Sequence, residues 1–410
     1  MVNWNIINEY KYWIIIILIY LTYIKKLKYD KILSKAENSN FLHSHEKYNK
    51  VQPNNLTEKN EKKLILENGR KYLDKCLNTK NIEFYEVNKN PIITNIIPSY
   101  NCEKTIIASI HSIQYQNFSN FEIIIVDDCS SDNSREIIKN IQINDKRIKL
   151  IENKRNMGTL YSRCLGALLS KANYILCLDN DDLFFDGDVF DFLHKQSIKD
   201  NLDLVSFRAL EINNYFDGTS KMKYYRFYGF QNNFYLSQPD LGIWTISLNG
   251  KFCIHDNEIW LKYIKSNIYK KAVNILGIKR YSKYICWAED TNINFIIFNI
   301  AQSFKYVNKI GYIHIRRNSS ASYKQNINRK LFGELFFLDV MFDFSKNNSD
   351  KNFAVSYSFY LKNRYKLNQY TNNTNYNYLK FILNKIIESQ FITTENKQKI
   401  KNSFKSFFNF

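Results

Sequence analysis

Short apolar runs alternate with helical patterns between residues 92 and 182. The apolar runs lie at 92–101, interrupted by Pro98, and at 121–128, 147–152 and 174–178. Between them, apolar residues recur at helical spacing over 103–114, from about 130 to 143, and over 158–171. Strands that alternate with helices of about 10–15 residues predict a parallel, doubly wound α/β sheet with right-handed crossovers.

Carboxylates follow two of these predicted strands where they end. Asp127 and Asp128 follow one strand, and Asp179, Asp181 and Asp182 follow another. Open α/β sheets bind ligands at the C-terminal edge of their strands. Because clustered carboxylates without a positive partner repel one another, a divalent cation that also contacts phosphate oxygens would relieve the repulsion. The alternative for the Asp179–Asp182 group alone is an acidic loop or a helix N-terminus, which Asp favours.

Four motifs mark the ends of the predicted strands. They are IPSYN at 97–101, IVDDCSSD at 125–132, NKRNMG at 153–158 and LDNDD at 178–182. In this order and spacing they resemble the nucleotide-sugar half of a family 2 glycosyltransferase of the GT-A fold. The resemblance continues through 249–252, 260–276, the WAED sequence at 287–290 and 312–322, so it covers about residues 92–322.

The resemblance implies a donor site for a nucleoside-diphosphate sugar, most simply a UDP-linked one. Pro98, Ser99 and Tyr100 would cradle the base after the first strand. Asp128 would accept a hydrogen bond from the base ring nitrogen, and Asp179 would face the ribose. Asp127 and Asp128 also have a purely structural alternative, because carboxylates are common in the turn after a strand.

The resemblance also implies a metal and a general base. Asp181, the second acid of a DxD motif, would bind Mn²⁺ or Mg²⁺ that stabilises the charge of the departing diphosphate. Asp290, paired with Glu289, would remove the proton of the acceptor hydroxyl in an inverting single displacement. Alternatively, the pair begins a helix and complements its dipole, which does not exclude catalysis. His314 stands where the family often has an aromatic residue; it would ligate the metal, contact the diphosphate or be structural.

Some features depart from the family pattern or limit it. Arg155 and Arg163 either approach the diphosphate or are solvated, and Cys164 stands where Asn is usual, which weakens a role for Arg163. The chain has no QxxRW sequence after the domain and no bundle of long apolar spans, which favours transfer of one sugar per encounter. Its seven cysteines show no CxxC pair, which predicts core thiols rather than a disulfide scaffold or zinc site.

Composition narrows the possible partners. The chain has 410 residues, of which 45% are hydrophobic and 16% aromatic, so general disorder is excluded. Its net charge of +19 indicates nucleic-acid binding, attraction to anionic membranes or diphosphates, or a Lys- and Asn-rich composition. Nucleic acid ranks last because the charge is not gathered on a nucleic-acid motif.

The two ends predict association with a membrane. Residues 13–24 form an apolar run of about 18 Å as a helix, marginal for a span of about 30 Å, and indicate an anchor, an interfacial helix or a helix packed on the globular part. Lysines after the run favour a cytosolic catalytic part. Residues 361–410 carry nine basic and two acidic residues with aromatic residues at the end, which suits an anionic membrane surface or a packed helical cap.

These patterns predict four regions. Residues 1–30 are a hydrophobic anchor, and residues 31–90 are a stalk or linker that contains a helix over 61–77. Residues 91–322 are a GT-A domain, and residues 323–410 are a basic helical region. Aromatic residues among polar ones at 207–251 are either an acceptor wall or core. The predicted function is metal-dependent transfer of one sugar to a hydroxyl of a glycan, lipid or protein. The alternatives are a catalytically inactive family member that acts as a scaffold, and a nucleotidyltransferase.

Overall fold

The computed structural model describes residues 56–78, 86, 89–213, 225–228, 234–237, 258–282, 284–285, 287–316, 327–344, 374–390 and 392–405. All of them belong to one compact unit, Asn55–Phe410. The predicted anchor at 1–30, the stalk at 31–55, most of the aromatic segment at 207–251 and the end of the last motif at 317–322 lie outside the described residues.

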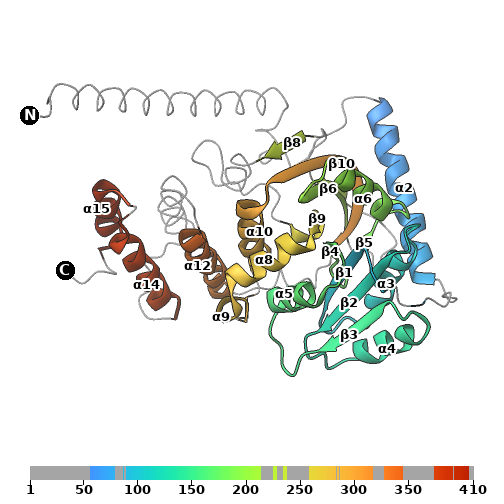
Figure 1. Ribbon diagram of the computed structural model, residues 1–410, viewed down its shortest axis with the longest axis horizontal. Helices are drawn as coiled ribbons and strands as arrows, with labels where there is room; N and C mark the ends of the chain where they lie inside the picture. The colour runs from blue at the N-terminus through green and yellow to red at the C-terminus, as the bar shows by residue number, and fades with distance from the viewer. Residues whose placement is uncertain are drawn as a thin grey trace, which may run out of the picture. The chain divides into compact units, whose positions relative to one another are not determined.

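The described strands form one ten-stranded sheet (Figure 1). Its main path runs β3-β2-β1-β4-β9-β6-β10-β5, while β7 pairs with β6 and β8 pairs with β10. The strands are β1 (Ile93–Ser99), β2 (Phe121–Asp127), β3 (Ile148–Glu152), β4 (Tyr174–Cys177), β5 (Leu183–Phe184), β6 (Leu204–Asn213), β7 (Tyr225–Tyr228), β8 (Phe234–Ser237), β9 (Lys262–Lys265) and β10 (Ser303–Arg316).

The four strands predicted from the sequence pair in parallel, as expected. β1 lies between β2 and β4, and β3 pairs with the far side of β2. The predicted intervening helices are α3 (Ile106–Gln114), α4 (Ser134–Asn144) and α5 (Thr159–Leu169). Beyond β4 the pairing differs in part from the prediction of a mostly parallel sheet: β9 inserts antiparallel between β4 and β6, whereas β6 and β10 pair in parallel. The whole sheet is therefore mixed.

Helices cover both faces of the parallel half. Ile97 of β1 packs in one core with α3, α4 and α6 (Val189–Lys199). The neighbouring Ile96 points to the opposite face, where α5 crosses the sheet. A Cβ atom at Gly166 of α5 would lie 2.6 Å from Ile96 Cγ2, so the helix approaches the strand as closely as glycine permits. This approach brings the residues at the start of α5 to the edge of the sheet where β1 and β4 end.

The helix predicted over 61–77 is α2 (Leu56–Asn78), and it is part of the folded unit. Its residues Leu73 and Cys76 are buried in a second core with Ala108 of α3 and residues of β6 and β10. The Tyr72 hydroxyl donates a hydrogen bond to the Ser112 carbonyl (3.2 Å). The segment before the sheet is thus fixed against α3 through its apolar face.

The C-terminal helices pack as a cap beside the site-bearing helix. They are α12 (Ile327–Phe344), α14 (Thr374–Glu388) and α15 (Thr394–Ser403); α12 lies between α14 and α10 (Glu289–Ile300), as Figure 1 shows. Phe404 is fully buried, which agrees at this residue with the packed helical cap, one of the two alternatives for 361–410. Phe407, Phe408 and Phe410 lie outside the described residues.

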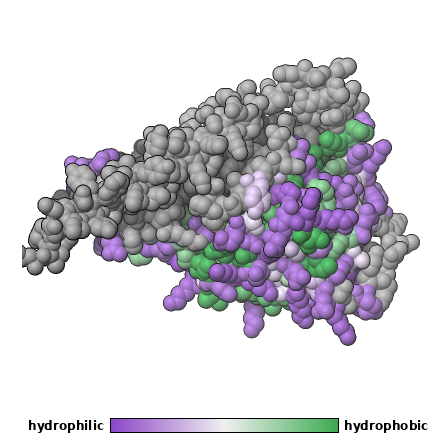
Figure 2. Space-filling model, turned by 45° about the horizontal axis from the view of Figure 1, so that its top comes forward, coloured by the Kyte–Doolittle hydropathy of each residue, from purple (hydrophilic) through white to green (hydrophobic). Residues whose placement is uncertain are grey.

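No helix in the described ranges is both long and apolar enough to cross a bilayer. Among the residues coloured in Figure 2, hydrophilic ones predominate on the visible face and hydrophobic ones form small groups. The prediction of core thiols holds for most of the described cysteines, which are all free: Cys76, Cys102, Cys164 and Cys177 are buried, whereas Cys129 is half-buried.

Candidate active site

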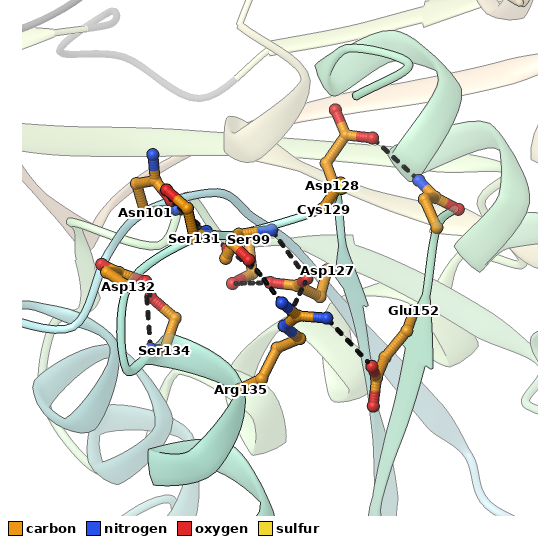
Figure 3. Close-up of polar contacts among 12 residues, drawn as sticks. Ser99, Asn101, Asp127, Asp128, Cys129, Ser131, Asp132, Ser134, Arg135 and Glu152 are labelled. Atoms are coloured by element: carbon orange, nitrogen blue, oxygen red, sulfur yellow. Dashed lines mark hydrogen bonds and ion pairs between the residues drawn. The ribbon is translucent and has the colours of Figure 1, made fainter. Parts of the chain in front are cut away.

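The two acids that end β2 have different environments. In Figure 3, Asp127 points into a group with Ser99 and Arg135, whereas Asp128 points away from it. Asp127 is buried and accepts hydrogen bonds from the backbone N–H (3.0 Å) and hydroxyl (2.5 Å) of Ser130. Asp127 therefore stabilises the turn after the strand, which is the structural role that the sequence left open for it.

The predicted base-binding residues lie at the end of β1. Pro98 is paired in register with Val126, and the buried Ser99 hydroxyl donates to Asp127 Oδ1 (3.4 Å). Tyr100, by contrast, is 47% exposed. Only the Tyr100 side chain of these three is available to stack on a ligand, while Pro98 and Ser99 shape the backbone beneath it.

Asp128 organises the motif at 153–158. Its buried carboxylate accepts hydrogen bonds from the N–H groups of Met157 and Gly158 (both 2.7 Å) and from the Asn153 amide (2.9 Å). Gly158 has a φ of +90°, a conformation that side-chain-bearing residues rarely adopt. Since an ionised carboxylate offers about four acceptor positions, Asp128 retains capacity for one further donor.

The turn after β4 is held by hydrogen bonds to strand β10. The Tyr312 hydroxyl accepts a hydrogen bond from the Asp179 N–H (3.1 Å) and donates one to Asp182 Oδ2 (2.9 Å). Asp182 Oδ1 accepts from the Ile315 N–H (2.7 Å). Burial raises the pKa of Asp182 well above its usual range. Asp182 is therefore a structural acid, and it leaves the half-buried Asp179 and Asp181 at the rim of the turn.

Arg163 joins two of the predicted site residues. Its Nη2 lies 2.5 Å from Asp179 Oδ1, and its Nη1 forms an ion pair with Asp290 Oδ1. Its side chain is 3% exposed. Burial opposes its charge, but Asp290 and Asp179 raise the pKa of Arg163, so it stays cationic. The solvated alternative for Arg163 is wrong, and so is the premise that the carboxylates lack a positive partner.

Sequence reasoning missed this pairing because its members are far apart in the chain. Arg163 is 16 residues from Asp179 and 127 residues from Asp290. The available signal was its place on a predicted helix directly after the 153–158 motif, which begins at the ligand edge of the sheet. Arg155, in contrast, is exposed.

The candidate general base Asp290 and its neighbour Glu289 lie at the start of helix α10. Glu289 and Asp290 are its first two residues, so the predicted helix-start position is correct. Asp290 Oδ2 accepts from the Ile259 N–H (3.3 Å), and the side chain remains 19% exposed. Burial raises the pKa of Asp290, and burial together with the charge of Asp290 raises the pKa of Glu289 to about 7. A carboxylate with a raised pKa and access to solvent suits proton removal.

His314 lies on the same strand as Tyr312, two residues further on. Its ring stacks on Trp260 with centroids 5.4 Å apart, and its Nδ1 lies 3.2 Å from Glu211 Oε2. Although burial lowers it, the charges of Asp182 and Glu211 raise the pKa of His314 to about 9. A protonated imidazole donates hydrogen bonds and has no lone pair for a metal.

The residues of the site could hold a metal only together with a ligand. Among the described residues, no three Asp, Glu, His or Cys side chains are grouped so that they could hold an ion. Asp179 pairs with Arg163 and Asp182 is hydrogen-bonded to β10, whereas Asp181 is half-buried at the rim of the turn. Mg²⁺ commonly takes one or two carboxylates and completes its shell with phosphate oxygens and water, and a single carboxylate fits that pattern.

Comparisons with known proteins agree with the motif resemblance. Residues 94–245 match the family model Glycosyl transferase family 2. Over 93 residues, 23% of this chain and 36% of the relative, the sequence is 39% identical to WfgD of Escherichia coli, a UDP-Glc:alpha-D-GlcNAc-diphosphoundecaprenol beta-1,3-glucosyltransferase. It is 30% identical to the glycosyltransferase GlyG of Streptococcus pneumoniae over 114 residues, 28% of this chain and 38% of GlyG. The chain thus spans less than two fifths of each relative.

A solved structure shares the fold over more of the chain. S. aureus TarS 1–349 in complex with UDP-GlcNAc superposes with a TM-score of 0.53 at 14% sequence identity, covering 78% of this chain and 88% of TarS 1–349. At this identity the similarity concerns the fold, a mixed sheet with helices on both faces.

Proposed function

We propose, on the premise that residues 94–245 of this chain are a glycosyltransferase family 2 domain, that the protein transfers one sugar from a nucleoside-diphosphate donor to an acceptor hydroxyl. The observation that carries the proposal is the contact of Arg163 with two carboxylates: it pairs with Asp179 of the LDNDD motif and with Asp290 of the WAED sequence, so both lie at one edge of the sheet. A UDP-linked donor is supported by the UDP-glucose in the name of WfgD and by the UDP-GlcNAc bound to TarS.

The donor would lie across the ends of β1, β2 and β4. The exposed Tyr100 ring offers a stacking surface for the base, and Asp128 has an acceptor position left for a base N–H. Asp179 would face the ribose. The cationic His314 and Arg163 would attract the diphosphate, because charge-assisted hydrogen bonds to phosphate are stronger than neutral ones.

The acceptor would approach from the side of α10. Asp290 would accept the proton of the acceptor hydroxyl as its oxygen attacks the anomeric carbon, so the sugar is transferred with inversion. Arg163 would hold the Asp290 carboxylate in place and keep it ionised. A Mn²⁺ or Mg²⁺ at Asp181 would supply Lewis-acid stabilisation of the departing diphosphate when bound.

Calorimetric titration of the full-length protein tests the donor site. We expect UDP to bind in the presence of Mn²⁺ and to bind at least about tenfold more weakly after chelation with EDTA, which corresponds to about 1.4 kcal/mol. Asp181→Asn should lose most of this metal dependence, whereas Asp191→Asn, an exposed acid on α6 paired with Lys195, should not. If UDP does not bind with or without Mn²⁺, the scaffold alternative is favoured.

The acceptor and the membrane contact belong to the same proposal. The acceptor in the name of WfgD is linked to diphosphoundecaprenol, and a lipid-linked acceptor would require the protein to work at a membrane surface. In this chain the support is the basic helix α15, which carries Lys397, Lys399 and Lys401, together with the apolar run at 13–24. Lys385 of α14 contributes less because it pairs with Asp339 and Asp343.

Sedimentation with lipid vesicles tests the membrane contact. The full-length protein should pellet with phosphatidylglycerol vesicles, and exchanging the three α15 lysines for Gln should remove the salt-sensitive part of the binding. Deleting residues 1–30 should remove the part that resists salt. A protein that stays in the supernatant with both anionic and neutral vesicles would contradict the proposal.

A further inference from the structure

Helix α12 holds Trp287, which lies three residues before Asp290. The indole Nε1–H donates a hydrogen bond to Glu334 Oε1 (3.1 Å), and Lys330 Nζ lies 4.5 Å from the centre of the Trp287 ring. Lys330 and Glu334 are one helical turn apart, so they contact Trp287 from the same face of α12. The indole is thus held through both its N–H group and its ring.

The backbones of the two segments also touch. Gly333 lies between Lys330 and Glu334, and a Cβ atom built on it would be 2.1 Å from the Trp287 carbonyl oxygen. No side chain fits in that space, and the obstructing atom belongs to the backbone. Gly333 is therefore the residue that permits α12 to lie directly against the segment that leads into α10.

The position of α12 is itself fixed by charged side chains, of which Asp339 is buried and the others are partly buried. Asp339 accepts hydrogen bonds from Lys385 (2.7 Å) and Tyr378 (3.2 Å) of α14. Asp343 pairs with Arg280 of α9 (Ile278–Tyr281) and with Lys385. These pairs connect α12 to helices on both sides, so α12 provides a rigid support for Trp287.

Only one residue, Ala288, separates Trp287 from Glu289 and the candidate general base Asp290. Ala288 has a φ of +57°, which is unfavourable for a residue with a side chain and persists only where the surroundings impose it. Glu289 and Asp290 follow at once as the first turn of α10. A shift of Trp287 would therefore be passed to the Asp290 carboxylate and to its ion pair with Arg163.

We propose that α12 positions the catalytic carboxylate: Gly333, Glu334 and Lys330 hold Trp287, and through it the first turn of α10, so that Asp290 faces the acceptor hydroxyl. This inference rests on the proposed function for the role of Asp290. It makes the C-terminal helical region, which lies beyond the 94–245 family match, a working part of the active site.

Two sets of variants test the support. Gly333→Ala forces the segments apart, and its matched control is Gly69→Ala on α2, where the nearest atom to a new Cβ is the end of the flexible Leu210 side chain at 3.2 Å. Glu334→Ala removes the acceptor for the Trp287 indole, whereas Glu334→Gln keeps an oxygen that can accept it. The Glu334 pair decides the question if Gly333→Ala does not fold.

The first readout is hydrogen exchange of the full-length protein, which needs no substrate. Gly333→Ala and Glu334→Ala should exchange faster over 287–295 and remain unchanged over β2, and Glu334→Gln should resemble the wild type. The second readout is turnover of a UDP-sugar: kcat should fall by up to about 100-fold for Gly333→Ala, because small misplacements of a catalytic group have effects of that size, while UDP affinity stays constant.

The two readouts separate the outcomes. Faster exchange over 287–295 with lower kcat and unchanged UDP affinity supports the proposal. Unchanged exchange and unchanged kcat in Glu334→Ala overturn it, and so does a loss of UDP affinity as large as the loss of kcat, since that indicates general disruption. If the wild-type protein binds UDP but turns over no donor, the proposed function fails, and the exchange data still decide whether α12 supports the start of α10.

Discussion

Replacing Asp290 with Asn is expected to lower kcat for sugar transfer by about 10²–10⁴-fold, the usual contribution of a general base. The amide has nearly the shape of the carboxylate but cannot take up the proton of the acceptor hydroxyl. UDP affinity should change little, because Asp290 lies at the start of α10, whereas the uracil of UDP would bind at the ends of β1 and β2. Steady-state kinetics with calorimetry on the same preparation separates the two effects.

The same assignment has a pH signature. Since burial raises the pKa of Asp290, activity should fall as the pH falls through a range above the value of about 4 for exposed carboxylates. The neighbouring Glu289, whose pKa is raised to about 7, titrates in coupling with it. The sign follows from the mechanism, because only the ionised Asp290 accepts a proton. Glu289→Gln removes a neighbouring negative charge and should move this acid limb to lower pH.

Asp191→Asn is the matched control for Asp290→Asn. Asp191 is an acid on α6 whose partner is Lys195 one turn away, and an exposed pair of this kind contributes little to stability. Its replacement should leave kcat and the pH profile unchanged. Turnover by Asp290→Asn at the wild-type rate would show that another group acts as the base.

Replacing Arg163 with Gln is expected to cost about 3 kcal/mol in the free energy of unfolding at neutral pH, because it leaves buried carboxylates without their cation. We take the lower end of the range for such changes because Asp179 is 28% exposed and Asp290 is 19% exposed. Arg163→Lys keeps the charge but has one donor group where two carboxylates need a bridge, so its cost should be intermediate. Urea unfolding of the three proteins measures the differences.

The stability loss in Arg163→Gln should depend on pH in a defined direction. Arg163 lowers the pKa of Asp290, so its removal raises that pKa further above the unfolded value. A carboxyl group whose pKa is higher in the folded than in the unfolded state does not destabilise the fold while it is protonated. It lowers the free energy of unfolding as the pH rises through the folded-state pKa. The variant should therefore approach wild-type stability at low pH, and kcat should be reduced at neutral pH because less Asp290 is ionised.

Arg329→Gln provides the control for this substitution. Arg329 is an exposed residue in the first turn of α12, and its replacement should change the free energy of unfolding by about 0.5 kcal/mol or less. A destabilisation of Arg163→Gln as small as that of Arg329→Gln, with no dependence on pH, would mean that the bridge is weak and does not hold Asp290.

Sequence reasoning reached its limit at two places: the part of the sheet beyond β4, where parallel and antiparallel pairs mix, and the two acids at the end of β2. Strands β1 to β4 alternate with helices, and such a pattern specifies both the elements and their parallel pairing. Strand β9 has no such neighbour pattern, and its insertion between β4 and β6 depends on where the chain returns to the sheet. Asp127 and Asp128 read alike in sequence, yet adjacent residues of a strand point to opposite sides, so one stabilises a turn and the other holds the 153–158 motif.

The sequence by itself determined the parallel half-sheet, the helices between its strands and the gathering of acids at one edge, because apolar spacing and strand ends are local properties of the chain. Only the tertiary structure decided which acids have a positive partner and what supports the candidate base. Arg163 meets Asp290 across 127 residues, and Trp287 meets Glu334 across 47. Such contacts depend on how closely helices pack, at glycines such as Gly166 and Gly333, and local patterns do not encode that distance.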